Sequence, residues 1–88
     1  VKAALEASVR YMAAELGPEN IRVLAISPCP IKTRAASGLE QFEHLIESTE
    51  EKAPILPLAN IDDVGTLVAF LASDGAKTIT GDTFYVDN

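Results

Sequence analysis

The sequence predicts an α/β chain with a parallel sheet. Two short apolar runs, at 21–26 and 83–86, have the composition of buried strands, and the segments before and between them carry helical stripes of apolar residues. The predicted order is helix, strand, short helix, helix, strand. Strands that alternate with helices over such spacings are joined by crossover connections, so we expect the two strands to run parallel. Two strands do not make a stable sheet alone, so we also expect a neighbouring strand.

The first helix is predicted over the opening residues, ending at Gly17. Its core-facing stripe at helical spacing is Leu5, Val9, Met12 and Leu16. Gly17 is expected to leave the helix in a left-handed conformation, and Pro18 prevents the helix from continuing. Small side chains beside the stripe allow a second surface to approach closely. We therefore expect a subunit interface formed by Ala3, Ala4, Ala7 and Tyr11.

The run 21–26 is apolar at nearly every position, which is typical of a parallel strand buried on both faces. Segment 27–30, Ser-Pro-Cys-Pro, is expected to end the strand, because proline has no N–H for the ladder. In an open parallel sheet, ligands bind beyond the carboxyl ends of the strands, so 27–33 is the first candidate site. Thr33 adds a hydroxyl at a helix start, where free N–H groups favour phosphate. The residues alone leave a purely structural stop to the strand as the alternative.

The second half of the chain predicts two helices and a strand. A weak amphipathic helix is indicated by Leu39, Phe42, Leu45 and Ile46. After a proline-interrupted loop at 53–58, Asn60 is a good N-cap for the next helix, and Asp62 and Asp63 in its first turn are favoured by the helix dipole. The core stripe of that helix is Val64, Leu67, Val68 and Leu71. The last strand, 83–86, is entered from Thr80 and Gly81.

Length and charge limit the class of protein. With 88 residues the chain holds one domain at most, and a core of that size is marginal by itself. The net charge of −6 argues against a general binder of nucleic acid or of an anionic membrane, because both need a clustered basic surface. A single cysteine forms no internal disulfide, which fits a reducing cytoplasm. No apolar run is long enough to span a membrane. Residues 1–5 read as the middle of a helix, so we expect an N-terminal part to precede them.

Four stretches of the sequence carry a resemblance to a known family. They are VKAALEA and VRYM at 1–12; GP, IRV and AIS at 17–27; PIKT and AASG at 30–38; and DVG, ITG and VD at 63–87. In this order they resemble the C-terminal third of the short-chain dehydrogenases/reductases, and specifically the bacterial NADH-dependent enoyl-acyl-carrier-protein reductases. The AASG run is the part most specific to that family. The family usually has glycine where Cys29 and Asn88 stand here.

The resemblance implies a doubly wound, Rossmann-type fold, of which residues 1–88 form the C-terminal portion of a single cofactor-binding domain. It implies the NADH-dependent reduction of trans-2-enoyl groups on acyl carrier protein, in fatty acid biosynthesis, by a cytoplasmic homotetramer. Lys2 matches the family's catalytic lysine, which holds the ribose hydroxyls of the nicotinamide and supports a tyrosine that would precede Val1. The other residues matched to cofactor contacts are Pro30, Ile31, Lys32, Thr33, Arg34 and Ala35. The residues matched to the mobile helix over the acyl chain are Ala36, Leu39 and Phe42.

Other residues have simpler interpretations. Cys29 is read as a half-buried thiol and His44 as a solvated side chain. Lys32 and Arg34 fit solvated loop charges as well as they fit groups that meet a phosphate or an acidic carrier protein. The acidic residues at 47–51 lack the spacing of metal ligands, so no metal site is expected. Two alternative functions stay open: another short-chain reductase, such as a ketoacyl reductase, and a non-catalytic fragment that only packs in an oligomer. The chain alone is expected to be inactive.

Overall fold

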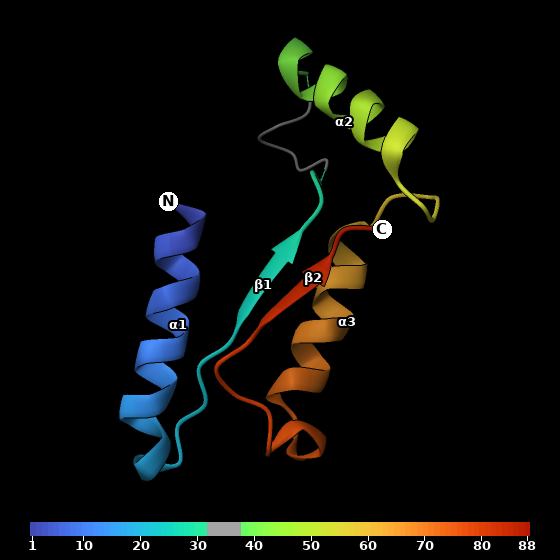
Figure 1. Ribbon diagram of the computed structural model, residues 1–88. Coiled ribbons are helices and arrows are strands. Elements are labelled where there is room, and N and C mark those ends of the chain that lie inside the picture. The colour runs from blue at the N-terminus through green and yellow to red at the C-terminus, as the bar shows by residue number, and fades with distance from the viewer. Residues whose placement is uncertain (32–37) are drawn as a thin grey trace.

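The computed structural model describes residues 1–31 and 38–88. Along the chain it has helix α1 (Lys2–Leu16), strand β1 (Ala25–Pro28), helices α2 (Glu40–Lys52) and α3 (Ile61–Ala72), and strand β2 (Thr83–Val86), as Figure 1 shows. Two short 3-10 helices follow α1 and α3: η1 (Gly17–Glu19) and η2 (Asp74–Ala76). The predicted order of helix, strand, helix, helix, strand is confirmed.

The two strands pair in parallel, with Ala25 opposite Thr83 and Pro28 opposite Val86, as the crossover argument predicted. Helices α1 and α3 lie on different sides of this pair (Figure 1). Two surface cavities agree with this arrangement, because one lies between α1 and residues 25–28, and the other lies between α3 and the residues that lead into β1. Helices thus lie on both sides of the strand pair, as in a doubly wound fold.

The core of the described residues is small, and it corrects the stripe predicted for α1. Its buried hydrophobic residues are Val9, Ala13, Cys29, Leu71 and Ala76. Leu5 and Met12 were expected in the core, but they are 60% and 46% exposed. The strands lie instead on the side of α1 that carries Val9 and Ala13. A Cβ atom at Gly81 would lie 3.3 Å from the Cβ of Ala13, so a small residue on each side permits the close approach.

The end of α1 also differs from the prediction. Gly17 is right-handed, with φ −54° and ψ −43°, and the chain continues into η1. Pro18 is tolerated there because the first turn of a helix does not need its N–H. Asn20 adopts the left-handed conformation instead, with φ 64°, and its N–H donates to the Gly17 carbonyl at 2.8 Å. Asparagine tolerates this region better than most residues, so the stop lies three residues later than expected.

Strand β1 begins at Ala25 and not at Ile21, and it includes Pro28, which was expected to end it. The Val23 N–H is taken by the Thr80 hydroxyl at 3.0 Å, so the regular ladder starts only with the Ala25 N–H, which donates to the Asp82 carbonyl. The Cys29 N–H donates to the Val86 carbonyl at 2.9 Å. Alternate residues of a strand face one neighbour, so position 28 points away from β2 and its missing N–H costs this ladder nothing.

Helix α3 begins where the sequence predicts. The Asn60 side chain accepts from the Asp63 N–H at 3.0 Å, and the Asp63 carboxylate accepts from the Asn60 N–H at 2.9 Å. This reciprocal pair is a capping box, which satisfies two N–H groups at the helix start. Of the predicted stripe, Leu71 is buried, whereas Val68 is 46% exposed.

Candidate functional site

The carboxyl ends of both strands meet at one edge of the sheet. At this edge Figure 1 also places the start of α1, the loop that follows α2, and the C-terminal residue. Ligands of open parallel sheets bind beyond this edge, because crossover helices cover the two faces. It is therefore the candidate site, and two of the cavities there contain residues that the sequence predicts to bind a ligand.

The first cavity contains Lys2. It has a volume of about 300 Å³ and lies between α1 and the end of β1. Its lining residues are Lys2, Leu5, Glu6, Ala25, Ile26, Ser27, Pro28 and Thr83. Lys2 is exposed, so its ammonium is accessible to a molecule bound in this cavity. The predicted catalytic lysine thus lies beside the carboxyl end of β1.

The second cavity contains Pro30 and Ile31, both predicted to contact the cofactor. It has a volume of about 220 Å³. Residues from α2 and from the loop before α3 complete its wall: Ile46, Glu50, Leu58, Ala59 and Asn60. Pro30 and Ile31 are half-buried there. The wall is largely apolar, which suits a flat ring or an alkyl chain.

The remaining predicted site residues either lie outside the described residues or do not line these two cavities. Lys32, Thr33, Arg34, Ala35 and Ala36 lie outside the described residues. Leu39 is the N-cap of α2 and is 59% exposed, and Phe42 is half-buried in the first turn of that helix. Neither Leu39 nor Phe42 lines the two cavities at the sheet edge. Their contact with substrate stays a prediction.

Glu6 links the Lys2 cavity to the last strand. Its carboxylate accepts a hydrogen bond from the Tyr85 hydroxyl at 3.0 Å, which ties α1 to β2. This hydrogen bond, and then the charge of Glu6, raise the pKa of the Tyr85 phenol above its ordinary value. Lys2 and Glu6 are four residues apart, so they share one face of α1, and both line the same cavity.

The tie gives a pH-dependent prediction for Tyr85→Phe in the full-length protein. A phenol whose folded pKa is raised contributes stability below its unfolded pKa, and the contribution is lost as the pH rises through the folded value. We expect the variant to be less stable than the wild type near neutrality, and the difference to shrink above about pH 10. Urea denaturation at both pH values measures this, with Tyr11→Phe as the matched control. An equal difference at both pH values would contradict the tie.

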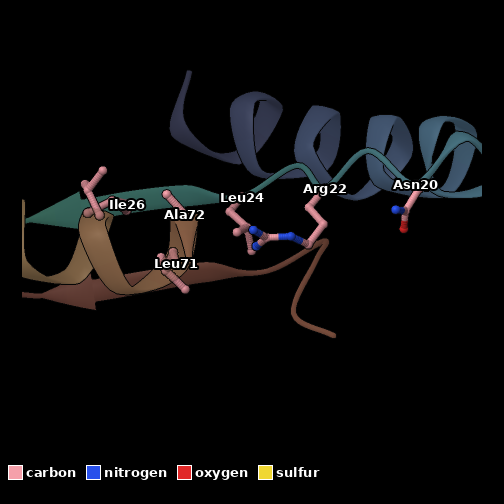
Figure 2. Close-up of a pocket in the computed structure, with 7 residues that line it drawn as sticks. Asn20, Arg22, Leu24, Ile26, Leu71 and Ala72 are labelled. Carbon is pink, nitrogen blue, oxygen red and sulfur yellow. The ribbon is translucent and has the colours of Figure 1, made fainter. Parts of the chain in front are cut away.

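A third cavity lies at the other end of β1. Its volume is about 460 Å³, and Figure 2 shows Asn20, Arg22 and Leu24 along the approach to the strand, with Leu71 and Ala72 of α3 beside it. The Arg22 guanidinium already donates to the Ile79 carbonyl, at 3.5 Å. Of the predicted site residues that the structure describes, none lines this cavity. It lies on the amino side of the strands, where this fold does not bind its ligands.

The sequence prediction missed Asn88, which follows β2. Its Oδ1 accepts from the Ala59 N–H at 2.8 Å, and its Nδ2 donates to the carbonyls of Ile55 and Pro57 at 2.9 and 2.8 Å. The sequence offered one signal, because Asn88 stands where the resembled family has glycine. In the structure, the φ of Asn88 is 57°, in the left-handed region that glycine adopts freely. Cys29 was expected to be half-buried, but it is buried, and its thiol makes long contacts to the Ala59 carbonyl and to Asn88 Oδ1.

Residues 1–31 and 38–88 contain no group of three or more His, Cys, Asp or Glu side chains placed to hold a metal ion. Within the same ranges, no helix has both the length and the apolar composition needed to cross a membrane.

The fold and the position of the site define a class. A parallel strand pair with helices on both sides, and cavities at its carboxyl edge, is typical of the Rossmann-type α/β proteins. Residues 1–88 match the family model described as enoyl-(acyl carrier protein) reductase. The chain therefore belongs to the enoyl-acyl-carrier-protein reductase family.

Individual relatives agree with this assignment. The chain is 49% identical to the NADH-dependent enoyl-acyl-carrier-protein reductase of Escherichia coli, over 98% of this chain and 33% of that protein. It is 44% identical to the NADPH-dependent enzyme of Staphylococcus aureus, over 99% of this chain and 34% of that protein. The crystal structure of the NADH-dependent enzyme from Aquifex aeolicus superimposes with a TM-score of 0.88 at 44% identity, over 99% of this chain and 34% of that one. The chain thus spans about a third of the length of these relatives.

Proposed function

We propose that this chain is the C-terminal portion of an NADH-dependent enoyl-acyl-carrier-protein reductase, and that residues 1–88 belong to one cofactor-binding domain. The observation that carries the proposal is the position of Lys2, the residue matched to the family's catalytic lysine. It lies exposed in the first turn of α1, in a cavity with Ser27 and Pro28 at the carboxyl end of β1. This is the edge at which a Rossmann-type sheet binds its nucleotide.

The residues at this edge fit a nicotinamide cofactor. An exposed ammonium offers three N–H donors, which suit the ribose hydroxyls. Pro30 and Ile31 provide a rigid apolar wall for the ring, and the stretch Lys32–Ala35 would complete the cofactor contacts. Leu39 and Phe42, with Ala36, would contact the acyl chain of the substrate.

The reduction of an enoyl thioester needs a hydride donor and groups that stabilise negative charge. NADH supplies the hydride that adds to Cβ of the enoyl thioester. Negative charge then develops on the thioester oxygen, where the charge of Lys2 and a phenol donor from an upstream tyrosine stabilise it. An apolar wall keeps water from the reacting atoms. We place this reaction in fatty acid biosynthesis in the cytoplasm, where a free thiol such as Cys29 persists.

The test is an assay of the full-length protein with trans-2-enoyl-acyl carrier protein and NADH. We expect oxidation of NADH, followed by its absorbance, at least tenfold faster at equal concentration than oxidation of NADPH. Parallel assays with a 3-ketoacyl substrate distinguish the proposed enoyl reductase from the alternative, a ketoacyl reductase. Reduction of the ketoacyl group alone would replace the proposed function, and no reduction of either substrate would favour a non-catalytic role.

We also propose that the full-length protein assembles as a homotetramer through the outer face of α1. Ala3, Ala4, Ala7 and Tyr11 are all exposed, and Tyr11 is 75% exposed. Ala7 and Tyr11 lie opposite Val9 on the helix, so they face away from the strands. Small side chains on such a face let a second helix approach closely.

Ala7→Arg in the full-length protein is expected to weaken this assembly, because a long charged side chain would separate two closely packed helices. Light scattering across a concentration series should give a smaller mass for the variant than for the wild type. Thr78→Arg, in an exposed turn after η2, is the matched control and should leave the mass unchanged. A wild-type protein that is monomeric, or a variant of unchanged mass, would refute the interface.

A further inference from the structure

Asn88 fastens the loop between α2 and α3 to the end of β2. Its side chain bonds three backbone groups of this loop: the Ala59 N–H and the carbonyls of Ile55 and Pro57. Its own backbone carbonyl accepts from the Ile55 N–H at 3.2 Å. One residue thus satisfies four backbone groups of segment 53–60.

This segment depends on such support. It contains Pro54 and Pro57, which have no N–H, and residues 53–60 form no helix or strand of their own. Ile55 and Leu56 are 67% and 57% exposed, so burial of their side chains contributes little to fixing the loop. Hydrogen bonds from outside the loop therefore determine its position.

The position of the loop decides the shape of the candidate site. Leu58, Ala59 and Asn60 form one wall of the cavity that Pro30 and Ile31 line from the other side. The hydrogen bond from the Ala59 N–H to Asn88 fixes the middle of that wall. The cavity thus lies between the segment that follows β1 and the loop that Asn88 holds.

We propose that Asn88 is a positioning residue of the binding site, which holds the Leu58–Asn60 wall against Pro30 and Ile31 and so sets the affinity for the bound substrate and cofactor. The inference rests on the proposed function. An asparagine is suited to this role because its amide offers one acceptor and two donors at once, and the three loop groups use all of them. An aspartate at this position would bring a carboxylate against the two carbonyls.

Asn88→Gly in the full-length protein separates this role from a backbone role, because glycine keeps the left-handed φ of 57° and removes only the amide. We expect KM for the enoyl substrate or NADH to rise about tenfold while kcat stays within about twofold, since several hydrogen bonds to the wall are lost but Lys2 is untouched. Asn88→Asp, of the same shape, should raise KM at least as much. Asn20→Gly is the matched control, because Asn20 has a φ of 64° and lies at the other end of β1.

Amide hydrogen exchange gives a second measurement that does not depend on activity. The Ala59 amide, whose partner is the Asn88 side chain, should exchange about tenfold faster in Asn88→Gly than in the wild type, and at the wild-type rate in Asn20→Gly. If the full-length protein reduces no enoyl substrate, the proposed function fails. Faster exchange of the Ala59 amide in Asn88→Gly, together with weaker NADH binding, would still support the positioning role of Asn88. Unchanged exchange at Ala59, or an unchanged KM and NADH affinity in both Asn88 variants, would overturn the inference.

Discussion

Lys2→Met in the full-length reductase is expected to lower kcat/KM with NADH by about ten- to a hundredfold or more, with the fold intact. Methionine keeps the length and helix propensity of lysine but removes three N–H donors and the charge. A charged hydrogen bond to a ribose hydroxyl is worth about 1.5–3 kcal/mol, which corresponds to this range. Loss of support for the upstream tyrosine would add to it. Steady-state kinetics and NADH titration measure the two effects separately.

The control for this variant is Lys77→Met. Lys77 is also an exposed lysine, but it follows η2 at the amino end of the sheet, away from the candidate site. Its replacement should leave the kinetics unchanged. Lys2→Arg is a second test, because it keeps the charge and changes the geometry of the donors, and it should restore only part of the activity. Wild-type kinetics in Lys2→Met would remove Lys2 from the site.

Local chemistry decided which parts of the fold the sequence could predict. Asn60 and Asp63 form their capping box within four residues, so the start of α3 was predictable without knowledge of the rest of the fold. The end of α1 was not, because Gly17 and Asn20 both tolerate a left-handed conformation and Pro18 fits a helical first turn as well as a stop. The buried face of α1 depends on where the strands lie, and the apolar stripe through Leu5 and Met12 did not contain that information.

The same distinction applies to the site. The position of Lys2 at the carboxyl edge follows from the resemblance together with the rule for parallel sheets. The positions of Pro30 and Ile31 in the site were predictable because both residues come just after the carboxyl end of β1. Asn88 was missed because its partners, Ile55 to Ala59, are about thirty residues away in sequence. A long-range bond from a side chain to the backbone of a loop leaves no periodic pattern in the chain.

The 88 residues expressed alone are expected to show no reductase activity and no cooperative unfolding. Their accessible surface of 6547 Å² compares with about 5000 Å² for a folded monomer of this mass. Their radius of gyration of 15.3 Å compares with about 12 Å for a compact domain of this length. Large apolar side chains are exposed on both main helices, among them Leu5 and Met12 of α1 and Val68 and Phe70 of α3. Such surfaces need further strands and helices to bury them, and the two strands make only one pair.

Urea denaturation followed by circular dichroism tests the folding part of this prediction, and NADH oxidation with the enoyl substrate tests the catalytic part. The full-length protein is the positive control for both measurements. A mixture of the 88 residues with the separately expressed upstream part should regain a cooperative transition, because the exposed apolar faces of α1 and α3 then become buried. A sharp transition in the 88 residues alone would show that the small core around Val9, Ala13 and Leu71 is sufficient. Turnover by the 88 residues alone would show that Lys2 needs no upstream partner, and it would overturn the mechanism proposed for this site.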